Sequence, residues 1–346
     1  MKLYHLKHVP WLESQLLYHA MPRVGLEGLL ILAPAEPYVC IGYHQDLRQE
    51  VDLDYCEEEG IPVFRREVGG GAVYLDGSQV FYQMVLHRDN PLAHGSKMSF
   101  YQRFLQPVAE VYRDLGVPAH YRPINDIITR DGRKISGNGA ASICDCAVLV
   151  GNLIADFDYE TMSRVLRVPD EKYRDTVFKS MRENLTTLSR ETGRTPAWDE
   201  MVRPLVSRLE QVLGTLEPAA LPPSVYEKAD ELKPTFLGDD WLHKKGKRIP
   251  GREIRIAAGV DVIQRVHKSP GGLLRATLEV KGDRLSGVTL SGDFFAYPRG
   301  SIQRLERELA GASLERVASI VSAFYASGGV ETPGVTAEDW LKVLLG

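Results

Sequence analysis

The chain has 346 residues, of which 44% are apolar and 25% are charged, and its formal net charge is −4. These values are ordinary for a globular protein with a sizeable core, and the length suits one large domain with a smaller one. No block of basic residues is present, which argues against nucleic acid as a partner. No run approaches the roughly 18 apolar residues of a spanning helix, so we expect no membrane partner either.

The cysteine content and the N-terminal residues indicate a reducing compartment. Four cysteines are too few for a disulfide scaffold in a chain of this length. Residues 1–21 contain no uninterrupted apolar segment of the kind that forms a signal peptide. We therefore expect a cytoplasmic protein with free thiols.

Hydrophobic patterning predicts alternating helices and strands over the first two hundred residues. The expected helices are at residues 11–21, 100–115, 161–166 and 197–213. The expected strands are at residues 28–33, 37–42, 61–65, 124–129, 133–136 and 147–155. A glycine-rich turn follows residue 65, and residues 72–75 and 80–86 are expected to form a hairpin.

The composition changes after residue 214. Residues 217–223 are proline-rich and predict a connection. Further on, the expected strands are at residues 272–278 and 285–290, and the expected helices are at 301–309 and 313–325. This pattern suits a small α+β module. We predict two domains, at residues 1–245 and 250–346.

The strongest motif runs from Arg65 to Tyr74, with the sequence RREVGGGAVY. Three consecutive glycines after a strand permit positive φ and place no Cβ in the way of a ligand. Backbone N–H groups can then approach anionic oxygens closely. The two arginines add forked donors that suit phosphate. The motif is not a P-loop, because no Lys-Ser or Lys-Thr pair follows the glycines.

A second motif combines Asn125-Asp126 with the segment GRKISGNG at residues 132–139. Lys134, on a strand flanked by glycines, can reach over a bound nucleotide. Its ammonium would neutralise an α-phosphate and steady an acyl carbonyl during attack. The Asp126 carboxylate is a sensible ligand for Mg²⁺, which prefers carboxylate and phosphate oxygens.

Taken together, these motifs in this order resemble the lipoate–protein ligase family. Further similar segments are Ile41 to Gln45, Gly151 to Ile154 and Pro169 to Lys172 with Asn184 to Thr186. Residues 250–346 resemble the accessory domain of bacterial-type ligases, mainly through Gly271 to Leu273 and Ser291 to Phe294. The resemblance implies an α+β fold with the mixed sheet of biotin ligases and class II synthetases.

The resemblance also implies an activity and a set of site residues. The enzyme would use ATP and Mg²⁺ to form lipoyl-AMP from lipoate, then transfer the lipoyl group to a lysine of a carrier. That carrier would be a glycine-cleavage H-like protein or a dehydrogenase-complex lipoyl domain. Lys134 would be catalytic and Asp126 would bind Mg²⁺. The implied ATP-binding residues are Arg66, Gly71, Ala72, Val73, Tyr74, Asn125, Asp126 and Lys134. The implied lipoate-binding residues are Arg65, Gly69, Gly70, Lys134 and Gly137.

The chain departs from the family pattern at several uncharged positions, which suggests a divergent subgroup. Val68 stands where Ser or Thr is usual, and Val150 replaces the His of an HGTLL segment. Asn138-Gly139 replaces a small Ser/Ala pair. Leu75 replaces a His, and Ser78-Gln79 replaces Gly-Asn. These changes concern the shape of the lipoyl pocket and leave the charged chemistry intact.

Two other functions fit the same fold. Octanoyl and lipoyl transferases use a cysteine nucleophile and no ATP, but Pro123 to Asp126 occupy the region before Gly132 where that cysteine would lie. Cys144 and Cys146 come after Lys134 instead, and we interpret them as ordinary structural residues. A non-catalytic lipoyl-binding protein would need neither Lys134 nor Asp126.

Overall fold

The computed structural model describes residues 1–246 and 251–346. By its internal contacts the chain divides into two compact units. One comprises Met1–Arg167 with Arg182–Arg248, and the other comprises Val168–Met181 with Ile249–Gly346. Within the described residues, no helix combines the length and the apolar character that crossing a bilayer requires.

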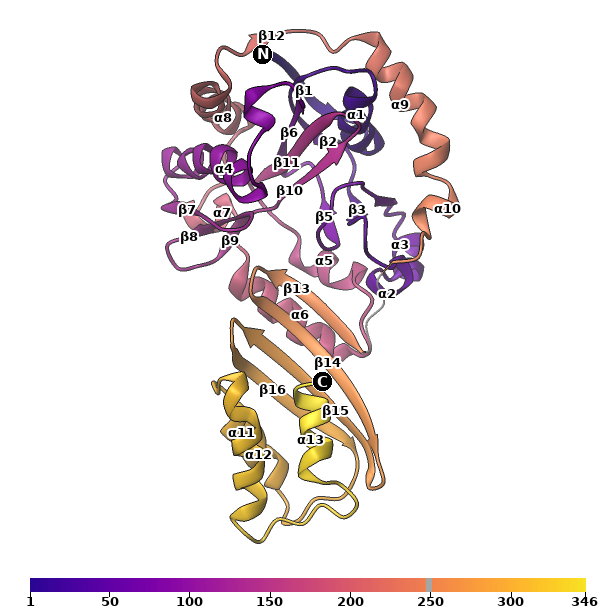
Figure 1. The fold of residues 1–346 in the computed structure, drawn as a ribbon, viewed down its shortest axis with the longest axis vertical. Coiled ribbons are helices and arrows are strands. Elements are labelled where there is room, and N and C mark those ends of the chain that lie inside the picture. The colour runs from indigo at the N-terminus through magenta and orange to yellow at the C-terminus, as the bar shows by residue number, and fades with distance from the viewer. Residues whose placement is uncertain (247–250) are drawn as a thin grey trace. The chain divides into compact units, whose positions relative to one another are not determined.

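The first unit is built on a six-stranded sheet with the order β10-β11-β6-β2-β1-β12 (Figure 1). Its strands are β1 (Lys2–Val9), β2 (Gly28–Pro34), β6 (Gln79–His87), β10 (Asn138–Ile143), β11 (Cys146–Ile154) and β12 (Glu217–Pro218). β1 runs parallel to β2 and β12, whereas the β2–β6, β6–β11 and β10–β11 pairs are antiparallel. β2 is apolar along its whole length because both of its faces are covered.

Two helical layers cover this sheet. The helices are α1 (Trp11–Arg23) and α9 (Pro223–Phe236) on one side, and α4 (Lys97–Asp114) and α8 (Trp198–Leu213) on the other (Figure 1). Successive side chains of a strand point to opposite faces. Met84 therefore joins the core beneath α4 and α8, while Val85 joins the core beneath α1.

Two smaller sheets carry the motifs. One has the order β4-β3-β5 and the other β7-β8-β9. Their strands are β3 (Tyr38–Ile41), β4 (Val63–Arg65), β5 (Val73–Leu75), β7 (Ala119–Arg122), β8 (Asp126–Thr129) and β9 (Lys134–Ser136). Short helices fill the connections: α2 (Leu47–Glu50), α3 (Leu53–Glu58), η1 (Pro91–Ala93), α5 (Tyr159–Val165), α7 (Leu188–Thr192) and α10 (Asp239–Leu242).

The second unit is a four-stranded antiparallel meander packed on helices. Its strands are β13 (Arg252–Ala257), β14 (Val260–Ser269), β15 (Gly272–Lys281) and β16 (Arg284–Asp293). Its helices are α11 (Ser301–Leu309), η2 (Leu314–Arg316), α12 (Val317–Ala326) and α13 (Ala337–Leu344). Leu278 of the sheet packs in one core with Leu305 and the fully buried Trp340.

Most of α6 (Glu171–Asn184) belongs to this second unit, because residues 168–181 group with it. The phenol of Tyr173 is fully buried and donates to the Val262 carbonyl at 2.6 Å. This segment falls within the domain that the sequence predicts at residues 1–245. The expected start of the second domain, at residue 250, lies outside the described residues.

Most of the expected elements are present, but the expected hairpin of residues 72–75 and 80–86 is wrong. Both segments are strands, yet β5 pairs with β3, and β6 pairs with β2 and β11. The reason is that β6 is buried almost throughout and so belongs at the centre of the large sheet. The proline-rich connection is also shorter than expected, because Pro223 begins α9. Proline is favourable at the first position of a helix.

Candidate active site

The segment 66–72, here called the glycine loop, is shaped by its own first residue. The guanidinium of Arg66 donates from one terminal nitrogen to the carbonyls of Gly69 and Gly71, at 2.9 and 2.8 Å. The C=O and the following N–H of a trans peptide point in opposite directions. The N–H groups of Gly70 and Ala72 therefore point away from Arg66, on a loop whose glycines 70 and 71 are exposed. This arrangement suits an anion.

Gly42 packs directly against the backbone of the glycine loop. A Cβ built on Gly42 would lie 2.0 Å from the carbonyl oxygen of Gly70, so only glycine fits there. The next residue, Tyr43, donates its N–H to the Val68 carbonyl at 3.1 Å. Gly70 itself has φ +104, a conformation that side-chain-bearing residues rarely adopt. The Ile41-to-Gln45 segment therefore supports the loop's backbone.

A buried histidine of α1 ties that helix to the start of the loop. His19 is fully buried, and burial lowers its pKa to about 4, so the imidazole is neutral at pH 7. Its Nε2 accepts from the backbone N–H of Glu67 at 3.2 Å, so Nδ1 carries the proton and donates to the Gln15 carbonyl at 2.7 Å. Arg23 pairs with the Glu67 carboxylate at 2.9 Å.

Lys134 faces a buried carboxylate. Its Nζ lies 3.1 Å from Oδ1 of Asp126, whose side chain is only 2% exposed. Oδ2 of the same carboxylate lies 2.9 Å from a terminal nitrogen of Arg122. Lys134 keeps 21% of its side chain exposed, so its ammonium is accessible to a ligand while Asp126 fixes its position. Arg122 could not be selected from the sequence, because its pairing depends on the β7–β8 register.

Asn125 and Asn138 hold the two motifs together by a reciprocal contact. The side-chain amide of Asn125 donates to the carbonyl of Asn138 at 2.5 Å, and the amide of Asn138 donates to the carbonyl of Asn125 at 3.1 Å. The side-chain amide and the backbone carbonyl of Asn125 both bond to Asn138, so this contact positions the neighbouring Asp126. The start of β8 is thereby fixed against β10.

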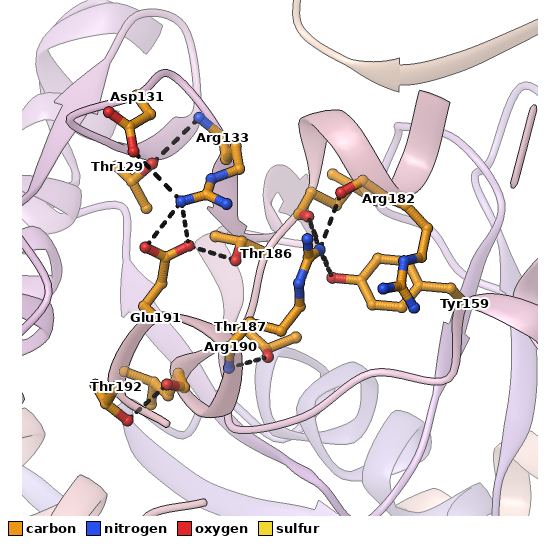
Figure 2. Close-up of polar contacts among 12 residues, drawn as sticks. Thr129, Asp131, Arg133, Tyr159, Arg182, Thr186, Thr187, Arg190, Glu191 and Thr192 are labelled. Atoms are coloured by element: carbon orange, nitrogen blue, oxygen red, sulfur yellow. Dashed lines mark hydrogen bonds and ion pairs between the residues drawn. The ribbon is translucent and has the colours of Figure 1, made fainter. Parts of the chain in front are cut away.

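The edge of β9 is completed by the segment after α6. Thr186 donates its N–H to the carbonyl of Lys134 at 2.8 Å. The Thr186 hydroxyl donates to Glu191 at 2.5 Å, and Glu191 also pairs with Arg133 at 3.0 Å (Figure 2). Glu191 thus links Arg133, the residue before Lys134, to Thr186, whose backbone pairs with that of Lys134.

A second arginine anchors the same segment from the other side. Arg190 donates to the carbonyls of Leu185 and Arg182, at 2.9 and 3.0 Å, and to the phenol of Tyr159 at 3.0 Å (Figure 2). The Tyr159 ring also faces two guanidinium groups. Its centroid lies 5.4 Å from the guanidinium carbon of Arg190 and 5.5 Å from that of Arg182. Cation–π contacts of this kind add to the hydrogen bonds.

The other predicted site residues lie on or beside these two motifs. Val73 and Tyr74 are on β5 directly after the loop, and Val73 packs towards the core beneath α1. Burial raises the pKa of Tyr74 to about 12, with Asp76 adding to the rise. Gly137 donates its N–H to Oδ1 of Asn152 at 2.7 Å, so the backbone after β9 is held against β11.

The structure assigns Arg65 a different role from the predicted contact with lipoate. Arg65 is fully buried, and its guanidinium donates to the carbonyls of Gln45, Leu242 and Lys244 at 2.7, 2.9 and 3.1 Å. Burial lowers the pKa of this guanidinium. The reason for the correction is geometric, because donors spent on backbone carbonyls cannot also face a ligand. Arg65 instead fastens residues 242–244 to the turn after β3.

The carboxylate of Asp126, the predicted magnesium ligand, is held by two cations. Both of its carboxylate oxygens already face cations, Lys134 and Arg122. A divalent ion at Asp126 would have to displace a side chain that is held in place. These contacts position Lys134, and the binding of Mg²⁺ by Asp126 stays a prediction.

Comparison with known proteins agrees with the sequence motifs. A family model described as the lipoyl protein ligase A/B catalytic domain matches residues 11–210. Lipoate-protein ligase LplJ of Bacillus subtilis is 26% identical over 308 residues, covering 88% of this chain and 86% of that protein. Octanoyltransferase LipM of Kyrpidia tusciae is also 26% identical, over 231 residues, covering 60% of this chain and 84% of that protein.

Proteins of Thermoplasma acidophilum resemble separate parts of the chain. Lipoate-protein ligase A subunit 2 is 46% identical over 77 residues, covering 22% of this chain and 81% of that protein. The solved bi-partite lipoate protein ligase has a TM-score of 0.63 at 26% identity, covering 72% of this chain and 98% of that one. A solved lipoate-protein ligase A bound with ATP has a TM-score of 0.58 at 23% identity, covering 70% and 98%. These likenesses confirm the α+β fold.

We predict that Arg65→Ala lowers the stability of the protein. Several buried carbonyls would lose their donor, and each such loss costs about 1–3 kcal/mol. The melting temperature should fall by roughly 5–10 °C, measured by circular dichroism. Arg88→Ala is the control, because Arg88 is 69% exposed and its pair with Asp145 is a surface ion pair. An unchanged melting temperature for Arg65→Ala, with weaker lipoate binding, would restore the ligand contact.

Proposed function

The chain belongs to the lipoyl protein ligase A/B catalytic-domain family, and we propose that it is an ATP-dependent lipoate–protein ligase. The observation that carries the proposal is the pair of Lys134 and Asp126, together with a glycine loop whose N–H groups suit an anion and whose Val68 lies against Gly139. Phosphate needs N–H donors and a fixed cation, and these residues provide both.

In the proposed first step, the lipoate carboxylate attacks the α-phosphorus of ATP and pyrophosphate leaves. The two reactants are both anionic, so they repel until a cation is placed between them. The ammonium of Lys134 neutralises this charge, and its effect is largest where water is excluded. The N–H groups of Gly70 and Ala72 would hold anionic oxygens of the substrates. In the second step a carrier lysine attacks the acyl carbonyl, and AMP leaves.

Asp126 and its supports make Lys134 a preorganised group. Positioning a charge before the reaction removes the cost of reorganising it in the transition state. The Asp126 carboxylate supplies this position from one side, and the Thr186 N–H fixes the Lys134 backbone from the other. Any magnesium would accompany the phosphates of ATP.

The cysteines give little support to a transferase that uses a covalent intermediate. Burial raises the pKa of Cys146, whereas a nucleophilic thiol needs a lowered one. Cys144 lies just beyond the end of β10 that is farthest from Asn138. At about 3.3 Å per strand residue, that separation is roughly 20 Å. The similarity to an octanoyltransferase remains the reason to test this alternative.

The proposed acceptor is a lysine of a small lipoyl domain or an H-like carrier protein. The solved T. acidophilum ligase is described together with its E2 lipoyl domain. A non-catalytic lipoyl-binding protein is the weaker alternative, because binding alone requires no cation positioned by a buried carboxylate. We propose the second unit as the accessory domain that assists adenylate formation, and the cytoplasm as the compartment.

The first experiment is to incubate the protein with lipoate and ATP, with Mg²⁺ as the counter-ion of ATP. We expect lipoyl-AMP and pyrophosphate, because the site suits phosphate. Mass spectrometry would detect the adenylate, and a coupled assay would detect pyrophosphate. Acyl transfer from an octanoylated acyl carrier protein in the absence of ATP would instead identify a transferase.

We predict that Lys134→Ala lowers the rate of ligation by about 100- to 1,000-fold, the usual cost of removing one preorganised electrostatic group. Lys134→Arg should be nearly as damaging, because a planar guanidinium does not fit the place of a compact ammonium. The rate would be measured by lipoylation of a carrier domain, with circular dichroism to check the fold. Lys281→Ala, an exposed lysine at the end of β15, should be nearly silent. A Lys134→Ala variant with more than about a tenth of the wild-type rate would refute the role.

We predict that Cys144→Ser combined with Cys146→Ser keeps most of the ligase activity. Neither thiol lies in the site around Lys134, so neither should be needed for chemistry. The double variant would be assayed for carrier lipoylation beside the wild-type protein. Loss of activity to background in a folded double variant would show that catalysis is covalent after all.

A further inference from the structure

Two departures from the family pattern, Val68 and Gly139, contact each other in the structure. A Cβ built at Gly139 would lie 2.6 Å from Cγ1 of Val68, a separation that real Cβ atoms essentially never show. Gly139 does not have positive φ, so its backbone does not require glycine. The space that an alanine would need is therefore taken by the Val68 side chain.

A third departure, Val150, lies at the same place. Gly139 on β10 pairs directly with Val150 on β11. Cγ2 of Val150 lies 3.8 Å from the built Cβ position, which is ordinary van der Waals contact. Val68 is 1% exposed and packs in the core beneath α1, with Val150 at the edge of that core. The branched side chain at position 68 is thus matched by the absence of a side chain at position 139.

This contact bears directly on the position of the glycine loop. Val68 immediately precedes Gly69, and its carbonyl accepts the N–H of Tyr43. A β-branched side chain such as valine has few accessible rotamers, so it cannot swing away from an obstacle. A side chain added at Gly139 would have to displace the Val68 backbone, and with it the three glycines.

We propose that Val68 and Gly139 are a matched positioning pair that seats the glycine loop for its anionic substrates. This inference rests on the proposed ligase function. The pair touches no reacting atom and acts through the loop. Its predicted signature is a change in KM for the substrates, lipoate included, with little change in kcat, because Lys134 stands on β9 and keeps its partner Asp126.

The test is a double-mutant cycle of Gly139→Ala, Val68→Ala and the combined variant, assayed for lipoyl-AMP formation. Gly139→Ala should raise KM for lipoate by about 10-fold, a coupling within the range measured for touching residues. Its kcat should stay within about threefold. Val68→Ala removes the obstructing methyl groups, so the combined variant should return to within about threefold of Val68→Ala alone.

Gly287→Ala is the matched control. Gly287 lies on β16, and a Cβ there would meet Glu279 at 3.4 Å, an ordinary contact. This variant should leave KM unchanged. A folded Gly139→Ala variant with normal KM would overturn the proposal, as would a combined variant no better than Gly139→Ala. If Gly139→Ala does not fold, the combined variant must restore both folding and KM. A combined variant that restores neither would also overturn the proposal.

Hydrogen–deuterium exchange separates this inference from the proposed function. The peptide containing residues 66–72 should exchange faster in Gly139→Ala and return towards the Val68→Ala rate in the combined variant. Exchange at the loop does not depend on catalysis. It therefore tests the positioning role of Val68 and Gly139 even if the wild-type protein forms no lipoyl-AMP. Unchanged exchange in all three variants would refute the seating role.

Discussion

Backbone carbonyls take up the donors of two adjacent guanidinium groups beneath the glycine loop. Arg65 is fully buried and Arg66 nearly so, and a buried charge is costly unless hydrogen bonds compensate for its lost hydration. Here the compensation comes from the carbonyls of the loop and of the segments around it. Those carbonyls must therefore face the arginines, and the N–H groups that follow them must face outwards. The outward direction of the loop's N–H groups is a consequence of how the two arginines are buried.

The same requirement explains why the two motif arginines differ in role. Arg65 faces the turn after β3 and the residues that follow α10, so it joins parts of the chain that are distant in sequence. Arg66 faces the loop that directly follows it. Neighbouring residues of an extended chain point in opposite directions, which is why one guanidinium serves the framework and the other serves the loop.

The elements with strong apolar patterning could be predicted from the sequence, and the pairing of strands could not. The amphipathic α4 and the buried β2 are present as expected. The partner of β5 was missed because a short connection favours a hairpin locally, whereas burial of β6 on both faces is a tertiary effect. In the site, Lys134 and the glycine loop were identified from composition and order. Arg122 and Glu191 were not, because their contacts arise only when separate strands are brought side by side.

The departures from the family pattern affect the support of the site more than its charges. Asn138 holds the residue before Asp126, and Val68 packs against the strand that carries Asn138. Neither position carries a charged group. Core and supporting positions accept substitution when a neighbour compensates for the change in volume or hydrogen bonding. A subgroup can therefore diverge at these positions while Lys134 and the N–H groups of the glycine loop stay unchanged. The proposed chemistry constrains only the groups that face the reacting charges.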